Sequence, residues 1–540
     1  MNVDLELYRV FCEVVKYKNI SKAAESMYIS QSAVTQSIQK LETILGGKVF
    51  YRNKTGVELT EEGKNLYEYV KNSIETMNNA ENIFSKYITL EKGKVRIGGN
   101  NSLITSLIVS PLLNFIKNSP SCYHAIDNMK QILDENGFCE VVEGKNWTIK
   151  EGGKYYVIRN NSSLIAFKIP NKDFKGFNIV SSHSDSPTFK IKENHEIEVD
   201  KKMVKLNVEK YGGMIFSTWF DRPLSIAGKI VVREGNKFVS KLVNIDRDLV
   251  IIPNLAIHFN RNINDGYKYN AQNDMLPLFG DINAKGRLMS LVAQNAGVCE
   301  EDILGSDLFL YNRMSGSIWG ADEEFISSPK LDDLQCAFSS LKGFLAGENK
   351  DTVQVCVVFD NEEVGSLTKQ GAESTFLADT LKRINNTMGR DEQDFYKATA
   401  NSFMISADNA HAVHPNYAQK SDPTNRPYMN EGIVIKFNAN QKYTTDSVSA
   451  AIFKSLCEEV DVPYQVFTNR SDMAGGSTLG NISNSQVSLN SVDIGLAQLA
   501  MHSSYETGGI KDTYYLVKVI ENFYNSSIIQ EDCGVLSINK

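Results

Sequence analysis

The chain has 540 residues, more than a single hydrophobic core usually spans, so about two to four domains are expected. Hydrophobic residues make up 42% and charged residues 23%, which is ordinary for a soluble globular protein. The net charge of -8 argues against a nucleic-acid or membrane binder over the whole chain, although it leaves room for a local DNA-binding face.

The start of the chain, "MNVDLELYRV", has no basic stretch followed by an apolar one, so no signal peptide is expected. The most apolar window, "LITSLIVSPLLNFI", is short and contains Ser and Pro, so it is not expected to span a bilayer. The eight cysteines lack both a CxxC pair and the spacing of a small disulfide domain, which favours reduced thiols. We therefore expect a cytoplasmic protein with no membrane partner.

The first ninety or so residues have a helical pattern. "LYRVFCEVV" places apolar residues at helical spacing, and "SKAAESM" and "SQSAVTQSIQKLETILG" follow with Ser21 and Ser30 as expected N-caps. Two short helices joined by "YIS" predict a helix-turn-helix. "KVFYRNKTGVEL" predicts two short strands that form a wing, and the amphipathic stretch from Thr60 to about Ser85 predicts a dimerising helix.

The stretch "FCEVVKYKNISKAAESMYISQSAVTQSIQKLETILGGKVFYRNKTGVELTEEG" resembles the winged helix-turn-helix of LysR-type transcriptional regulators. The resemblance implies that one helix faces the major groove of double-stranded DNA and that the wing reaches phosphates. The DNA-binding residues that it implies are Gln31, Ser32, Thr35, Gln36, Lys40, Arg52 and Lys54. Ser32 stands where the family often has Pro, and nearly balanced charges mean that affinity would come from a few well-placed cations. A small helical interaction module is the alternative.

After this segment, "GKVRIGGNNSLITSLIVSPLLNFIKNSP" resembles the opening strand and helix of a LysR sensor domain, but the resemblance goes no further. Beyond Ser121 apolar strands alternate with helical segments, which is typical of an α/β fold. The inducer-binding domain is therefore expected to be replaced by a second complete protein.

Polar residues gather where four apolar runs of this α/β region stop. The segments are "FNIVSSHSDSP", "VQVCVVFDNEEVGS", "SFMISADNAHAVHP" and "SVDIGLAQLAMHSSYE". Because ligands bind at the carboxyl ends of strands in open α/β sheets, we expect these ends to converge. Imidazole and carboxylate together suit divalent metals. Each segment alone has another interpretation: a strand that surfaces into solvent, a structural histidine, or, for "LDDL" at 331–334, the start of a helix.

The motifs "HSDSP", "TWFDRPLS", "LDDL", "DNEEVGS", "SADNAHAVHPNY", "IKFNANQKY" and "QLAMHS" resemble, in this order, those of the aspartyl and vacuolar aminopeptidase family. These are co-catalytic zinc peptidases, and the match runs from about Leu112 to the end. The resemblance implies two divalent ions per subunit, zinc first, with manganese or cobalt as alternatives. It assigns His183 and Asp408 to one ion, Glu363 and His502 to the other, and Asp332 as the bridge.

The resemblance also implies the remaining catalytic roles. Asp185 would fix the ring of His183, and Glu362 would act as general base. Because neighbouring residues on a strand point to opposite faces, two working glutamates in a row require the strand to end there, and Gly365 would permit the turn.

Three further residues concern the substrate. His258 matches a family histidine that is donated across a subunit interface to stabilise the oxyanion. Lys436 matches a lysine that could pair an acidic N-terminal side chain of the substrate, and His411 is also expected to bind substrate.

The family forms homo-oligomers built from dimers, commonly dodecamers. Two departures from its pattern are Asp333, where Asn is common, and Pro223, where Asp is common.

The expected fold is multidomain: an all-α winged helix-turn-helix followed by an α/β zinc-exopeptidase domain with an inserted β-rich dimerisation lobe. The expected parts are the winged helix-turn-helix at 1–60, a linker and dimerisation helix at 61–90, a truncated sensor start and junction at 91–120, the catalytic domain at 121–192 and 321–540, and the lobe at 193–320.

The expected function is release of N-terminal residues from peptides, with Asp or Glu as candidates, by a metalloaminopeptidase that carries a DNA-binding module. One alternative is a transcriptional regulator whose peptidase part serves as sensor or scaffold. Another is that the join is not natural, because both resemblances meet at 112–120.

Overall fold

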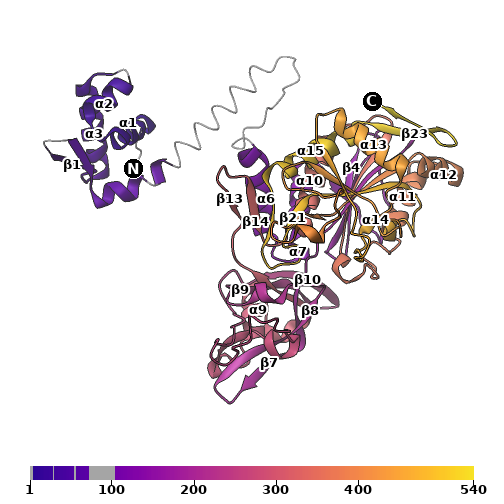
Figure 1. Cartoon of the computed structure of the whole chain (residues 1–540), viewed down its shortest axis with the longest axis horizontal. Coiled ribbons are helices and arrows are strands. Elements are labelled where there is room, and N and C mark those ends of the chain that lie inside the picture. The colour runs from indigo at the N-terminus through magenta and orange to yellow at the C-terminus, as the bar shows by residue number, and fades with distance from the viewer. Residues whose placement is uncertain (1–3, 28, 54–55, 68, 72–103) are drawn as a thin grey trace. The chain divides into compact units, whose positions relative to one another are not determined.

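The computed structural model describes residues 4–27, 29–53, 56–67, 69–71 and 104–540. Contacts divide the chain into two units, Met1–Gly98 and Gly99–Lys540 (Figure 1). The predicted succession of a helical N-terminal region and an α/β unit is confirmed. The dimerising helix is described only to residue 71, and the rest of that prediction lies outside the described residues. In the described part of the chain no helix is long and apolar enough to cross a membrane.

The described part of the N-terminal unit includes three helices and two short antiparallel strands around a small apolar core, and residues 61–67 and 69–71 are also helical. The elements are α1 (Leu5–Tyr17), α2 (Ile20–Ser26), α3 (Gln31–Leu45), β1 (Phe50–Asn53) and β2 (Gly56–Leu59).

The helix caps of this unit agree only in part with the sequence pattern. Ser30 caps α3 as predicted, because its side chain accepts the N–H of Ala33. Ser21 as the cap of α2 is wrong. Asn19 has an extended backbone, and its side chain accepts the N–H groups of Ser21 and Lys22, so the helix begins before Ser21.

A nine-stranded sheet forms the centre of the second unit, in the order β19-β18-β20-β16-β6-β15-β5-β4-β3. The four middle strands run parallel, and β6 and β15 are buried along their whole length, as expected of a sheet covered on both faces. The strands are β3 (Cys139–Glu140), β4 (Lys154–Arg159), β5 (Ser163–Lys168), β6 (Gly176–His183), β15 (Thr352–Phe359), β16 (Phe403–Ala407), β18 (Ile433–Lys436), β19 (Tyr464–Phe467) and β20 (Asn490–Gly495).

Alternate side chains of the sheet enter two separate hydrophobic cores. On β15, Cys356 and Val358 join one core, and Val355 and Val357 join the other. The first core includes residues of α7 (Cys122–Glu135), α10 (Leu331–Ala346), α13 (Ser447–Glu458) and α15 (Ile510–Tyr524). The second includes residues of α11 (Phe376–Thr387), α12 (Glu392–Ala400) and α14 (Leu479–Ser483).

The junction region packs into this second unit. A turn of π-helix, η1 (Thr105–Val109), continues into α6 (Ser110–Lys117). Leu112 is fully buried in the first core, and the ring of Phe115 lies 5.6 Å from that of Phe338 on α10. The helix at 110–117 is therefore part of the core of the α/β unit.

A six-stranded antiparallel sheet with its own core forms a lobe within the same unit (Figure 1). Its order is β10-β9-β12-β7-β8-β11, with α9 (Leu288–Ala296) packed against it. The strands are β7 (Thr188–Val199), β8 (Met203–Tyr211), β9 (Leu224–Glu234), β10 (Lys237–Asn244), β11 (Leu278–Asp281) and β12 (Ile303–Asn312).

A five-stranded sheet, ordered β13-β14-β22-β21-β17, supports the start of α10 and the turn between β21 and β22. Its strands are β13 (Ser317–Trp319), β14 (Phe325–Ser328), β17 (Ala410–His411), β21 (Ala497–Leu499) and β22 (Glu506–Gly509). The chain leaves β14 into the start of α10, and the turn between β21 and β22 contains His502. The hairpin of β23 (Ser527–Asp532) and β24 (Val535–Asn539) follows α15.

Candidate metal centre

The predicted convergence of strand ends occurs at the middle of the central sheet. His183 ends β6 and pairs with Phe359, the last residue of β15, in parallel register. Asp408 directly follows β16, which is the neighbour of β6 on its other side. Polar residues far apart in the sequence therefore meet at one edge, as the topology of a parallel sheet requires.

Imidazole and carboxylate groups are close together at this edge. Nε2 of His183 lies 3.6 Å from Oδ1 of Asp332 and 4.0 Å from Oδ1 of Asp408. Nε2 of His502 lies 3.6 Å from Oδ2 of Asp332 and 3.3 Å from Oε2 of Glu363. Asp332 thus directs one carboxylate oxygen toward each histidine. Two groups of ligand-type side chains share Asp332. One also contains His183, Asp333 and Asp408, and the other contains Glu363 and His502.

The protein atoms alone leave this cluster unsatisfied, which tests whether cations fit. Oδ1 of Asp332 and Oε1 of Glu363 are buried without a hydrogen-bond donor among the described residues. Buried carboxylates without a partner are costly, and several of them together are costlier still. Two divalent cations would neutralise that charge, and the mixture of imidazole and carboxylate is one that zinc accepts. The donor set therefore fits the predicted metals.

β15 ends before the two neighbouring glutamates, which lie together in a turn. Asn361, at φ 61°, and Gly365, at φ 99°, flank a short 3₁₀ turn, η5 (Glu362–Val364). The left-handed backbone at Gly365 is one that glycine adopts without steric penalty, in agreement with the predicted role. Burial raises the pKa of Glu362 to about 8, although the attraction of His183 opposes the shift.

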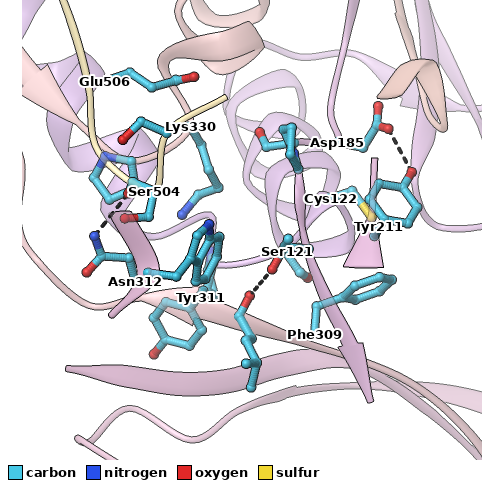
Figure 2. A pocket seen from close by; sticks show the side chains of 18 of the residues that line it. Ser121, Cys122, Asp185, Tyr211, Phe309, Tyr311, Asn312, Lys330, Ser504 and Glu506 are labelled. Atoms are coloured by element: carbon cyan, nitrogen blue, oxygen red, sulfur yellow. Dashed lines mark hydrogen bonds between the residues drawn. The ribbon is translucent and has the colours of Figure 1, made fainter. Parts of the chain in front are cut away.

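Asp185 holds both the histidine and this turn. Nδ1 of His183 lies 3.1 Å from the backbone carbonyl oxygen of Asp185 and 3.3 Å from its Oδ1. The Asp185 carboxylate also accepts the backbone N–H groups of Glu362 and Glu363, each at 3.2 Å. The hydroxyl of Tyr211, from β8 of the lobe, donates to Oδ2 of Asp185 at 2.7 Å (Figure 2). The side chain predicted to orient His183 therefore also anchors the glutamate turn.

The other predicted substrate residues lie in different surroundings. Lys436 is buried, with its ammonium 3.5 Å from Oδ2 of Asp408. His411 is exposed on β17, and its ring lies 6.1 Å from that of Phe467. His258 is exposed in the loop after β10 and is absent from the clustered groups.

The sequence did not single out Glu506 and Asn409, which position the ligands, and it marked Asp333 only as a departure from the family pattern. Glu506 accepts the backbone N–H groups of Asp332 and His502. Asn409 donates to the carbonyl of Leu331, and Asp333 accepts the backbone N–H of His183 at 3.2 Å. Burial raises the pKa of Asp333 well above its usual range, although His183 opposes this. The adjacency of Asn409 and Asp333 to ligands was the available signal, whereas nothing local marked Glu506.

The residues of the predicted DNA-binding surface lie on or near α3. Gln31, Ser32, Gln36 and Lys40 are exposed, and Thr35 is half-buried with its hydroxyl donating to the carbonyl of Gln31. Arg52 lies on β1, and Lys54 lies outside the described residues.

Comparison with known proteins gives the same division of the chain. Residues 115–524 match the model of the aminopeptidase I zinc metalloprotease family, M18, and residues 5–64 match that of the bacterial regulatory helix-turn-helix proteins of the lysR family. A probable M18 family aminopeptidase 2 of Clostridium novyi is 48% identical over 422 residues, which are 77% of this chain and 98% of that protein. One of Pseudomonas aeruginosa is 41% identical, over 77% and 97%.

Solved structures agree with this assignment. The chain is similar to one in the complex of Ape4 and Nbr1, with 36% identity and a TM-score of 0.76 over 79% of this chain and 87% of that one. It is also similar to the mApe1 dodecamer of S. cerevisiae, with 27% identity and a TM-score of 0.68 over 78% and 96%. The prediction of a metalloaminopeptidase is confirmed, and the chain belongs to the aminopeptidase I family of zinc metalloproteases, M18.

Proposed function

We propose that the chain removes N-terminal residues from peptides with a pair of divalent metal ions. His183 and Asp408 would hold one ion, Glu363 and His502 the other, and Asp332 would bridge them. The observation that carries this proposal is the pair of overlapping clusters that share Asp332. In each cluster a carboxylate oxygen of Asp332 lies 3.6 Å from Nε2 of a histidine. When bound, such ions lower the pKa of water and polarise a peptide carbonyl.

Glu362 supplies the proton transfer in this proposal. Its carboxylate lies within reach of His183 and Glu363 but is not one of the five proposed ligands. It takes a proton from the attacking water at a carboxylate oxygen and then gives it to the nitrogen of the departing amine.

Preference for an acidic N-terminal residue is a further part of the proposal. Lys436 carries a buried positive charge at the edge of the cluster, where it already pairs with Asp408. An ammonium has three donors, so it can also pair a carboxylate of the substrate. His411, exposed on the short strand after Asp408, would contact the same N-terminal residue of the substrate.

Removal of metal tests the proposed activity. Peptides beginning with Asp, Glu and Leu should lose their N-terminal residue in the presence of the protein, and dialysis against a chelator should stop the release. Zinc, manganese or cobalt should restore it, because the protein supplies the ligands but not the Lewis acid. Mass spectrometry of the products and their initial rates are the measurements. Release that continues unchanged after verified removal of metal would refute the metal mechanism, and equal rates for Asp and Leu would refute only the acidic preference.

Assembly into a homo-oligomer is proposed with His258 as a shared residue. The loop that carries it exposes Leu255 at 60% and Phe259 at 81%, which is unusual for large apolar side chains on one short segment. A second subunit that covers this loop would bury Leu255 and Phe259, and His258 would then lie near the metal centre of that second subunit. A relative of known structure is a dodecamer.

Double-stranded DNA is the proposed partner of the N-terminal unit. The exposed face of α3 offers Gln31, Ser32, Gln36 and Lys40, whose side chains suit base edges and phosphates. The antiparallel pair of β1 and β2 would serve as the wing, with Arg52 and Lys54 near phosphates. The match to the lysR family model supports this proposal.

Variants on α3 test the DNA proposal in gel-shift experiments. Duplexes selected from a random pool should bind the wild-type chain. Gln36→Ala should reduce the free energy of binding to the selected duplex by about 1–3 kcal/mol, because a base contact is lost. Lys40→Ala should weaken binding to all duplexes alike, and it should reduce the slope of log affinity against log salt concentration by about one, because a phosphate contact is lost. Glu362→Gln is the control, since it leaves this unit unchanged. If both α3 variants bind DNA as tightly as wild type, Gln36 and Lys40 are not part of the interface.

A transcriptional regulator with the peptidase unit as sensor or scaffold is the second candidate. The lysR match favours it, but a scaffold has no physical need for clustered, unsatisfied carboxylates. Whether the join is natural is a separate question, which mass spectrometry of a native peptide crossing Lys117 to Asn128 addresses.

A further inference from the structure

Glu506 lies between the two turns that carry metal ligands in the proposed centre. It is the first residue of β22 and pairs with Ser328, the last residue of β14. The chain leaves β14 toward Asp332, and the turn before β22 contains His502. The side chain of Glu506 is 1% exposed.

A single carboxylate spans both turns. Oε2 of Glu506 accepts the backbone N–H of Asp332 at 2.9 Å, and Oε1 accepts the backbone N–H of His502 at 2.7 Å. We propose that Glu506 is a positioning residue that holds Asp332 and His502 at the spacing the second metal ion requires. The inference rests on the two-metal centre proposed above and adds a residue that touches neither ion.

The backbone of His502 shows why such a restraint is needed. Its φ is 64°, in the left-handed region that non-glycine residues rarely occupy unless surrounding contacts hold them there. The bond to Glu506 is one such contact. Without it the turn could relax, and the imidazole would leave the position 3.3 Å from Oε2 of Glu363.

Glu506 also faces a small cavity behind the metal centre, of about 50 Å³ (Figure 2). Lys330, two residues before Asp332, lines the same cavity. Burial lowers the pKa of Lys330 to about 8, and the attraction of Glu506 opposes this shift.

Glu506→Gln separates positioning from bulk and shape. An amide has nearly the same size but only one acceptor oxygen, and its NH₂ group would face an N–H donor. One of the two backbone bonds is lost, and a buried N–H stays unpaired. Glu506→Asp keeps the charge but is one methylene shorter, so it cannot span both N–H groups at hydrogen-bond distance.

The experiment is a zinc titration of the metal-free full-length chain against a chromophoric chelator. Wild type should bind two ions, and both Glu506 variants should bind one of them about 10- to 100-fold more weakly, which is the usual loss when a group that orients a ligand is removed. Circular dichroism establishes that each variant is folded, and the Asp variant provides the test if the Gln variant is not.

Asp512→Asn is the matched control. Asp512 is also fully buried and also accepts two backbone N–H groups, those of Asn430 and Gly432, but it contacts no proposed ligand. It should lower thermal stability and leave both zinc constants at their wild-type values.

Several outcomes would overturn the positioning role: wild-type zinc constants in Glu506→Gln, restoration of the constants by Glu506→Asp, or an equal loss in Asp512→Asn. If wild type binds a single ion, the two-metal proposal fails. The role of Glu506 is then decided by that one constant in the same comparison, because Asp332 belongs to both clusters.

Discussion

Glu362→Gln is expected to lower kcat by about 10²- to 10⁴-fold while the chain keeps its metal ions. The amide is nearly isosteric and can still donate a hydrogen bond, but it cannot accept the proton of the attacking water. The five proposed ligands are unchanged, so the metal content per chain should equal that of wild type. Initial rates of N-terminal residue release and elemental analysis of the dialysed protein are the two measurements.

Glu373→Gln is the control for this substitution, because it makes the same chemical change at an exposed glutamate on the same loop. It should keep the wild-type rate. Full activity in Glu362→Gln would show that another group moves the proton. A joint loss of metal and activity would instead make Glu362 a ligand, an arrangement its proximity to His183 and Glu363 allows.

The convergence of the ligands could be predicted because it follows from topology. Parallel strands present their carboxyl ends at one edge, and His183 and Asp408 each end or follow such a strand. The end of β15 before Glu362 and Glu363 could also be predicted, since neighbours on a strand face opposite ways and only a turn lets both act at one site. The motif resemblance supplied the pairing of ligands, which alternation of apolar and polar residues cannot give.

The residues that hold the ligands could not be found in the same way. No residue pattern around Glu506 marks it as a partner of the ligands, and Asp332 follows β14, a strand that is the neighbour of β22 only in space. Tyr211 reaches Asp185 from the lobe, a contact that exists only once the two parts have packed. The prediction of the α2 cap was wrong for a different reason. Asn and Ser are both good N-cap residues, and the extended backbone at Asn19 makes it, and not Ser21, the cap.

Mixed oligomers of two inactive variants are expected to recover activity, if His258 acts in a neighbouring subunit. His258→Ala should lower kcat by about 10²- to 10³-fold, as loss of an oxyanion donor does elsewhere. Glu362→Gln is inactive for a different reason and keeps His258. In a dimer of the two, the site with an intact Glu362 receives an intact His258 from its neighbour, whereas the other site lacks both.

Random pairing makes half of the dimers mixed, and each mixed dimer has one complete site, so co-expression should give about one quarter of the wild-type rate. His195→Ala is the control, because it removes a different histidine from the lobe and should leave the rate unchanged. Activity no greater than the average of the two variants alone would mean that His258 serves its own chain or has no catalytic role. Since the loop exposes Leu255 and Phe259 in the single chain, recovery of activity should also coincide with the oligomeric fraction in size-exclusion chromatography. Activity confined to a monomeric fraction would contradict both the shared histidine and the proposed assembly.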